Sequence, residues 1–216
     1  TRMPFVIHTF LREARRHLPG GKISGGTQKA YARMPRIHLP PPAQLDMKLT
    51  DVLSRRRSSE AHGNSRIDTR TLGDLLGNAL GMTEEHRRYP SGGALYPIET
   101  YMVVRKVTDM PHAVFHYRPD EHALENLWEV EESARITGNE DADGASIILI
   151  FTALWERQAH KYGDFSYYLG MLEAGHMAQN VLLVSTALGL SARPFGGFDD
   201  AHITALLDLD TFVEQP

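Results

Sequence analysis

The sequence has no cysteine among its 216 residues, which excludes disulfide bonds, thiolate catalysis and cysteine-bound zinc or iron–sulfur clusters. It has no apolar run of the ~18–20 residues that cross a bilayer, so we expect no membrane partner. It also has no excess of positive charge. The formal net charge is −4, and no basic field favours nucleic acid as a partner. The lack of cysteine is typical of a cytosolic protein, and we expect a cytoplasmic location.

What the chain does contain is the composition of a globular domain. Hydrophobic residues make up 42% and charged residues 23%, the balance of a protein with a substantial core. Residues 3–18 could form an amphipathic helix, which the Pro-Gly-Gly at 19–21 would end. The chain to residue 46 is then rich in Gly, Pro and Ser. We therefore predict an N-terminal extension and connector over 1–46 and one domain over 47–216.

Periodicity predicts helices and strands in an order that favours an α+β architecture with a central sheet. The run at 146–154 is continuously apolar, which is typical of a strand buried on both faces. The segment 165–188 is apolar almost all round, so this helix should be central or lie in a subunit interface. The expected helices are 49–57, one capped by Asp68 or Thr69, 165–188, and one from Asp199 or Asp200 to Leu207; the expected strands are 98–104, 114–118, 123–128 and 146–154.

The run Arg55-Arg56-Arg57-Ser58-Ser59 stands at the expected end of the first of these helices. Cations there could simply complement the helix dipole. Guanidinium groups beside a hydroxyl can also bind several phosphate oxygens at once. The local sequence leaves both interpretations open.

Two glycine-rich segments, PSGGALYP at 90–97 and RPFGGF at 193–198, are candidate ligand-binding loops. Glycines in such places can supply the positive φ of a tight turn. They also let the backbone approach a flat ligand, which a side chain would prevent. The turn is the simpler interpretation for each segment taken alone.

Lys161-Tyr162 could be a solvated helix end or a proton-transfer pair. A lysine amine can act as a general base when burial or a neighbouring cation favours its neutral form. Glu173 and His176 have the Glu-x-x-His spacing of carboxylate-bridged di-iron bundles, but those need two such motifs. We therefore predict no metal site and expect Glu173, His176 and Asn180 to form a buried hydrogen-bonded row.

Taken in order, RRRSS, PSGGALYP, HKYGDFSYYLGMLEAGHMAQNVLL and ALGLSARPFGGFDD resemble the SagB-type dehydrogenases, a branch of the FMN-dependent nitroreductase superfamily. The resemblance spans residues 24–214. It implies a nitroreductase-like α+β fold, with an antiparallel-rich sheet flanked by helices. It also implies a homodimer that holds FMN at its interface, with the long helix 165–188 lying there.

The resemblance also implies roles for particular residues. Lys161 and Tyr162 match a Lys-Tyr pair that removes a proton in azoline oxidases. The flavin contacts are implied for three groups of residues: Arg56, Arg57 and Ser58 at the phosphate, Pro90, Ser91 and Gly92 on the isoalloxazine from the other subunit, and Gly196 and Gly197 beside flavin N5.

Departures from the family pattern affect these expectations. Glu60 stands where nitroreductases usually have a second basic residue for the phosphate, which makes Arg193 a candidate to complete that site. Ala94 replaces an asparagine, and Gly196 replaces a glutamate that some nitroreductases place beside N5. Both differences favour the SagB-like branch. The family's last apolar strand, which would follow Pro216, is expected to be missing from this chain, and both ends look cut from a longer protein.

The function that the resemblance implies is an FMN-dependent oxidation of a thiazoline or oxazoline to the thiazole or oxazole. The azoline would belong to a peptide natural-product precursor, on the peptide itself or bound to a carrier, and a biosynthetic synthetase is an expected partner. Lys161, with Tyr162, would remove the proton α to the carbonyl while FMN accepts the hydride. The alternatives are an NAD(P)H-dependent nitro- or quinone reductase on the same fold, and a non-catalytic flavin-fold binding module.

Overall fold

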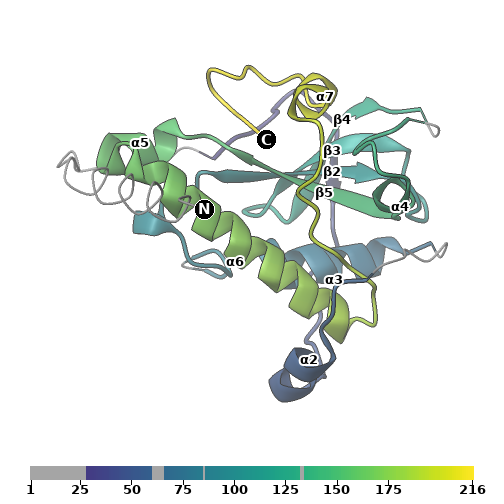
Figure 1. The fold of residues 1–216 in the computed structure, drawn as a ribbon. Helices are drawn as coiled ribbons and strands as arrows, with labels where there is room; N and C mark the ends of the chain where they lie inside the picture. The colour runs from purple at the N-terminus through teal and green to yellow at the C-terminus, as the bar shows by residue number, and fades with distance from the viewer. Residues whose placement is uncertain (1–27, 60–65, 85, 132–133) are drawn as a thin grey trace, which may run out of the picture.

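The computed structural model describes residues 28–59, 66–84, 86–131 and 134–216. A five-stranded sheet in the order β1-β4-β3-β2-β5 forms its centre. All its neighbouring strands are antiparallel, and helices lie on both faces (Figure 1). The predicted α+β fold with an antiparallel-rich central sheet is therefore confirmed. The helix predicted over 3–18 lies outside the described residues.

The helices and strands predicted over 49–207 are all present and in the predicted order, and both predicted aspartate caps are present. The strand Arg36–His38 and the helices Glu140–Asp143 and Glu156–Tyr162 were not predicted. Asp68 accepts a hydrogen bond from the Thr71 backbone N–H, and Asp199 accepts from those of Ala201 and His202. Such caps satisfy backbone donors that the first helical turn leaves free. The strands are β1 (Arg36–His38), β2 (Ile98–Val104), β3 (Ala113–Arg118), β4 (Ala123–Glu129) and β5 (Ile147–Ala153). The helices are α2 (Leu49–Arg55), α3 (Thr69–Leu80), α4 (Glu140–Asp143), α5 (Glu156–Tyr162), α6 (Phe165–Ala187) and α7 (Asp200–Leu206), with a 3₁₀ turn, η1 (Gly92–Ala94).

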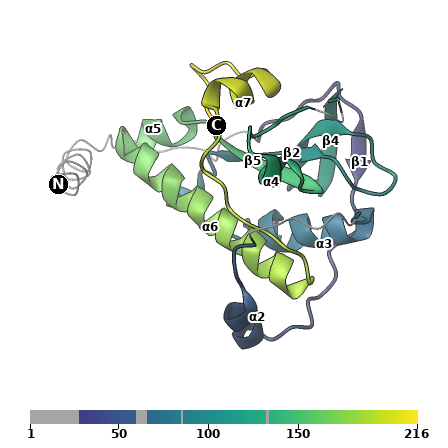
Figure 2. The ribbon, with the colours of Figure 1, turned by 45° about the vertical axis from the view of Figure 1, so that its right-hand side comes forward.

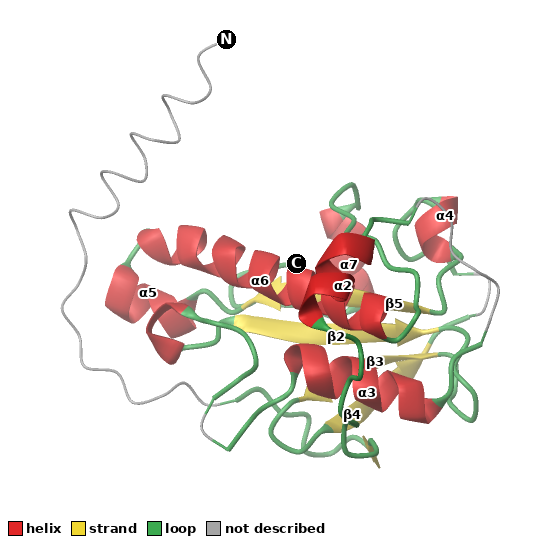
Figure 3. Cartoon of the chain, turned by 90° about the horizontal axis from the view of Figure 1, so that it is seen from below, coloured by secondary structure: helices red, strands yellow, loops and turns green. Residues whose placement is uncertain are grey.

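Helices α3 and α6 cover one face of the sheet (Figure 3). Leu72, Leu76 and Leu80 recur every four residues on α3, and all three are buried. They share one hydrophobic core with Ile98 and Met102 of β2. Each fully buried leucine of this kind contributes about 1.5–3 kcal/mol to folding, so this core fixes α3 against the strand that follows the glycine-rich segment 90–97.

The opposite face of the sheet is covered by α7 (Figure 2). Ile203 and Leu207 pack there in a second core with Tyr101 and Val103 of β2. Alternate residues of β2 therefore face two different cores, and all seven residues of the strand are buried.

Residues 28–46 of the predicted extension pack on this sheet in the structure. β1 pairs with β4 at one sheet edge, and Leu39 belongs to the core under α3. Lys29 donates to Tyr101 Oη at 2.5 Å and forms an ion pair with Glu214. The division of the chain into an extension and a domain at residue 46 stays a prediction. The described part of the extension, residues 28–46, packs on the sheet of the domain.

The prediction that 146–154 forms a strand covered on both faces is confirmed. Ile147, Leu149 and Phe151 of β5 pack against the core under α3, and Ile148 and Ile150 belong to the core under α7. The strand is nevertheless the edge strand beside β2, and most of its residues from Ile147 to Phe151 are only partly buried. A continuous apolar run gives no information about whether a second strand flanks it. On the outer edge of β5, the described residues supply a partner at the end of the strand. There Ala153 and Gln215 exchange two backbone hydrogen bonds of 2.7 and 3.1 Å.

Candidate functional site

Lys161 and Tyr162 lie on the last turn of α5, and the segment 90–97, here called the glycine loop, packs against them. A Cβ atom added to Gly93 would lie 2.9 Å from Lys161 Nζ and 2.7 Å from Tyr162 Oη. Gly93 also has a φ of +67°, which side chains rarely tolerate. The structure thus brings the Lys-Tyr pair and the glycine loop together within one chain.

The preceding turn of α5 binds the backbone of the same loop. Gln158 Nε2 donates to the Gly92 carbonyl at 3.1 Å, and Arg157 Nη1 donates to the Tyr96 carbonyl at 2.9 Å. Gln158 is fully buried. Neither residue could be predicted from the sequence, because a polar residue in a helical pattern gives no sign of a distant hydrogen-bond partner.

Glu173 of α6 fixes the end of the glycine loop. Its Oε1 accepts from the Ile98 backbone N–H at 3.5 Å, and Ser91 also hydrogen-bonds the carboxyl. Burial raises the pKa of Glu173 to about 7, although these hydrogen bonds and the nearby Arg87 oppose the rise. A substantial fraction of this buried carboxyl is therefore protonated at neutral pH.

The predicted phosphate residues Arg56, Arg57 and Ser58 directly follow α2. The structure joins this segment to the chain that follows α6, because the Ser59 backbone N–H donates to the Ala192 carbonyl at 3.1 Å. Two cationic segments far apart in sequence therefore lie side by side, and together we call them the basic corner (residues 56–59 and 192–193).

Arg193 is next in the chain after that hydrogen bond. Its guanidinium carbon lies 5.7 Å from the centre of the Phe195 ring. Its Nε is buried and has no hydrogen-bond partner among the described residues. Gly196 and Gly197 follow and are exposed, and a Cβ on Gly196 would meet no atom within 4 Å. This backbone is open to a ligand or to another chain.

A groove of about 810 Å³ lies between the glycine loop, α2 and the C-terminal half of α6. Leu49 and Val184 are among its apolar lining residues, and Asn78, Arg88 and Asn180 supply polar groups. A few polar groups in an apolar groove of this size are typical of sites for small molecules and cofactors. Of the predicted site residues, two line it: Pro90 and Ser91.

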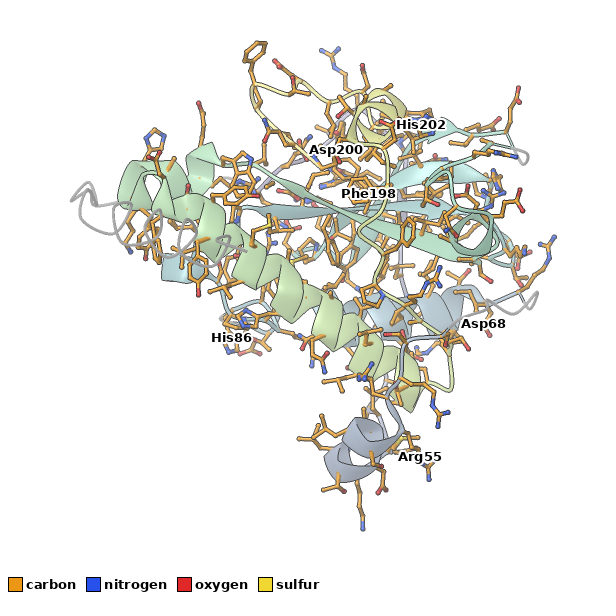
Figure 4. All side chains as sticks on the ribbon, in the orientation of Figure 1. Arg55, Asp68, His86, Phe198, Asp200 and His202 are labelled. Carbon is orange, nitrogen blue, oxygen red and sulfur yellow. The ribbon has the colours of Figure 1, made fainter. Side chains whose placement is uncertain are left out.

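The predicted catalytic pair and the predicted phosphate residues lie at opposite ends of α6. Lys161 and Tyr162 lie at its N-terminal end with Gly92, on which a Cβ would lie 2.9 Å from Leu169, whereas Pro90 and Ser91 line the groove beside the C-terminal half of the helix. The basic corner lies beyond its C-terminal end, and Arg55 marks the neighbouring end of α2 in Figure 4. A helix of 23 residues is about 35 Å long. One chain therefore does not bring Lys161 together with Arg56, Arg57 or Arg193.

A buried row of charged side chains connects α5 to the sheet. His116 of β3 lies between Glu99 Oε2 at 3.0 Å and Glu125 Oε2 at 2.9 Å. Glu99 also pairs with Arg157 at 2.5 Å. Burial acts to lower the pKa of His116, but the hydrogen bonds to Glu125 and Glu99 outweigh it and raise that pKa. The sequence does contain one sign of this buried row: Glu99 is a charged residue within the otherwise mostly apolar strand IETYMVV.

The expectation of a buried polar row on α6 is wrong at one position. His176 is exposed, whereas Asn180 donates to the carbonyls of Ala79 and Arg88 at 3.1 and 3.0 Å. The helix is rotated so that Glu173 and Met177 face the core. In the described part of the chain, no three histidine or carboxylate side chains gather as metal ligands. No helix of that part has both the length and the apolar character to cross a membrane.

Comparison with known proteins identifies the family. The model of the nitroreductase family matches residues 53–216. The chain belongs to the nitroreductase family. The nitroreductase-like fold implied by the resemblance is thereby confirmed.

The curated relatives of this nitroreductase-family chain include proteins that process peptides. MJ1384 of Methanocaldococcus jannaschii, provisionally named a nitroreductase, is 35% identical over 77% of this chain and 87% of its own length. The microcin B17-processing protein McbC of Escherichia coli is 31% identical over 70% of this chain. The trifolitoxin-processing protein TfxB of Rhizobium leguminosarum is 26% identical over 95%. The matches span 60% of McbC and 61% of TfxB. These peptide-processing relatives confirm the resemblance to the SagB-type branch.

Solved structures share the fold at low sequence identity. A nitroreductase-like protein from Ralstonia eutropha superimposes with a TM-score of 0.74 at 24% identity, over 92% of each chain. A chain of the E. coli microcin synthetase McbBCD complex, solved with truncated pro-MccB17, gives 0.68 at 22%, over 98% of this chain and 88% of that one. At these identities the likeness concerns the fold.

The residues of this nitroreductase-family protein fit FMN. The groove has room for a planar ring beside an apolar wall, and Arg193 offers a buried donor that no described group satisfies. Among the described residues, Arg56, Arg57 and Arg193 have no carboxylate within ion-pair distance. Such cations suit a phosphate.

Proposed function

We propose that this chain is a cytoplasmic FMN-dependent oxidase that converts a thiazoline or oxazoline in a peptide natural-product precursor to the thiazole or oxazole. The observation that carries the proposal is the Lys161-Tyr162 pair held against Gly93. A phenol and an amine at one backbone turn can take up and orient a proton. A reductase that only exchanges hydride with NAD(P)H would not need them.

In the proposed reaction, Lys161 removes the proton on the ring carbon α to the substrate carbonyl, and Tyr162 orients or relays it. The C–H electron pair then becomes part of the aromatic ring as the neighbouring ring carbon loses a hydride. The two-electron acceptor chemistry would come from FMN when it is bound, with dioxygen as the final acceptor. A positioned base of this kind contributes roughly 10²–10⁴-fold to the rate.

The proposed base Lys161 and the residues proposed to hold the FMN phosphate lie at opposite ends of α6. Because the helix between them is longer than an FMN molecule, we propose that a homodimer assembles each site from two chains. Arg56, Arg57, Ser58 and Arg193 would hold the phosphate, and Pro90, Ser91, Gly92, Gly196 and Gly197 would border the ring. The partly exposed apolar residues of α6, including Tyr167, Met171 and Leu172 at 55%, 46% and 42% exposure, support an interface along this helix.

The relatives support a peptide substrate and a larger assembly. McbC and TfxB are named for the processing of peptides, and the solved complex contains McbC together with McbB and McbD. By analogy, the present chain would act on a peptide or carrier-bound azoline delivered by a synthetase partner. The second candidate is a nitro- or quinone reductase, which the higher identity to MJ1384 favours.

Replacement of the proposed base tests this function. Lys161→Ala should leave FMN bound and the protein yellow, while the rate of thiazoline-peptide oxidation falls by ~10²–10⁴-fold. Lys106→Ala is the matched control, since Lys106 donates to the Gly144 carbonyl away from the glycine loop. Full turnover by Lys161→Ala would refute the base assignment. A protein that takes up no FMN on reconstitution would favour a non-catalytic binding module.

A further inference from the structure

Four residues on the last two turns of α5 contact the glycine loop: Arg157, Gln158, Lys161 and Tyr162. The first pair is Arg157-Gln158 and the second is Lys161-Tyr162. The second pair follows the first by four residues, about one helical turn, so the two pairs lie on one face of the helix. The first pair donates hydrogen bonds to loop carbonyls. The second pair lies against Gly93. Any shift of the loop relative to the first pair therefore moves the surface against which the second pair rests.

Gln158 is the buried member of the first pair. None of its side chain is exposed, and its Nε2 makes the single bond to Gly92 described above. Its Oε1 has no hydrogen-bond partner among the described residues. A buried amide that satisfies one of its two polar atoms gains little stability over an apolar side chain of the same size. Stability alone therefore does not explain a glutamine at this position.

The loop itself is held in a backbone conformation that most side chains avoid. Gly93, Ala94 and Tyr96 have φ values of +67°, +56° and +48°. Non-glycine residues stay in this region only where surrounding contacts fix them. Three of the contacts that fix this loop come from α5 and α6: Gln158 at Gly92, Arg157 at Tyr96 and Glu173 at Ile98. Others hold Tyr96 alone: Ser91 Oγ accepts from its N–H, and Arg87 lies over its ring.

We propose that Gln158 is a positioning residue for the Lys161-Tyr162 pair. It draws the Gly92 carbonyl toward α5 and thereby presses the Gly93 backbone onto the amine and the phenol. The role of the pair as proton acceptor rests on the proposed function. The geometric role of Gln158 does not depend on it, so the two can fail separately.

The test compares Gln158→Met with Gln215→Met in the purified full chain. Methionine keeps the length of the glutamine side chain and removes the donor. Gln215 is an exposed glutamine whose Nε2 also donates to a backbone carbonyl, that of Thr211 at 3.0 Å. Its Oε1 accepts from Trp155 Nε1 at the start of α5, so its replacement controls for a general disturbance of that helix. The first measurement is the acetylation rate of Lys161 by acetic anhydride, followed by peptide mass spectrometry. It requires neither bound FMN nor turnover.

We expect Gln158→Met to unfold at a temperature within a few degrees of wild type and to acetylate at Lys161 severalfold faster. Its kcat for thiazoline-peptide oxidation should fall roughly 10- to 100-fold, with KM within about twofold. Gln215→Met should match wild type in all three measurements. Unchanged acetylation of Lys161 in a folded Gln158→Met would overturn the proposal.

A second variant covers the case in which Gln158→Met does not fold. Gly93→Ala places a methyl group where Tyr162 Oη and Lys161 Nζ now lie, so it should also displace the amine and speed its acetylation. Wild-type acetylation in Gly93→Ala would contradict the packing on which the proposal depends. If acetylation changes as expected but wild-type protein oxidises no azoline, the positioning role stands and the proposed function falls.

Discussion

Glu173 is the residue whose protonation most directly affects the candidate site. Its carboxyl is buried under the glycine loop and accepts a hydrogen bond from the backbone of Ile98. Its pKa of about 7 means that folding favours the protonated form over the ionised one. A carboxyl with a raised pKa in the folded state destabilises the fold as it ionises. The loss begins above the ordinary pKa of 4.5 and is complete above about 7.

Glu173→Gln should remove this pH dependence. Between pH 5 and pH 8 the free energy of unfolding of wild type should fall relative to that of the variant by roughly 2–3 kcal/mol. Urea unfolding at the two pH values measures the difference. Glu140→Gln is the control, since the Glu140 side chain is 90% exposed. A wild type and a Glu173→Gln variant with parallel pH profiles would show that Glu173 ionises normally.

At the scale of the elements, the sheet contains a buried imidazole between two carboxylates on neighbouring strands. The pKa of His116 is raised in the folded protein. The stabilisation of the fold by its charged form is therefore complete below the ordinary pKa of 6.5, and it is lost as the pH rises through the raised pKa. Burial acts to raise the pKa of Glu99, but the hydrogen bond from His116 and the charge of Arg157 lower it. The stabilisation of the fold by the ionised Glu99 is therefore present above its ordinary pKa of 4.5, and it is lost as the pH falls through the lowered pKa. The row therefore stabilises the sheet most at intermediate pH.

Removal of the imidazole should be costly because it leaves two carboxylates facing each other in the core. His116→Leu should lower the free energy of unfolding at pH 7 by roughly 3–5 kcal/mol. His202→Leu, which removes an exposed histidine that bonds the Arg135 carbonyl, should change it by less than ~1 kcal/mol. Denaturant titration of both variants measures the contrast. Equal small losses would mean that the buried row adds no stability.

Local sequence patterns predicted the helices and strands better than they predicted which residues contact one another across the fold. The caps Asp68 and Asp199, the strand 98–104 and the hairpin that follows it depend on residues close in the chain, and all are present. The edge position of β5 and the exposure of His176 depend on which other elements pack nearby. The bond of Gln158 to Gly92 joins residues 66 apart, and no local pattern records such a contact. The assignments of the site residues to FMN and to proton transfer stay predictions.

At the scale of the whole molecule, the predicted catalytic pair and the predicted phosphate residues lie at opposite ends of α6, and we propose that two chains bring them together. The predicted homodimer would bring the basic corner of one chain to the glycine loop of another. It would also cover Tyr167, Met171 and Leu172 on the exposed side of the helix. Apolar side chains that recur along one helix are typical of such interfaces.

Met171→Lys should therefore convert a dimer into a monomer that binds FMN poorly, because a buried unpaired charge strongly disfavours association. Phe212→Lys is the control: Phe212 is 95% exposed but lies near the C-terminal end, off α6. Sedimentation velocity and the flavin absorbance of each purified variant report the outcome. A Met171→Lys dimer with full FMN content would place the interface elsewhere.

If FMN bound to this protein takes electrons from an azoline, the anaerobic absorption spectrum of the purified protein will report it. We predict visible flavin absorbance that a thiazoline peptide bleaches, that NADPH alone leaves unchanged, and that dioxygen restores. Flavin that NADPH bleaches while the thiazoline peptide has no effect would refute the proposed oxidation and favour the reductase.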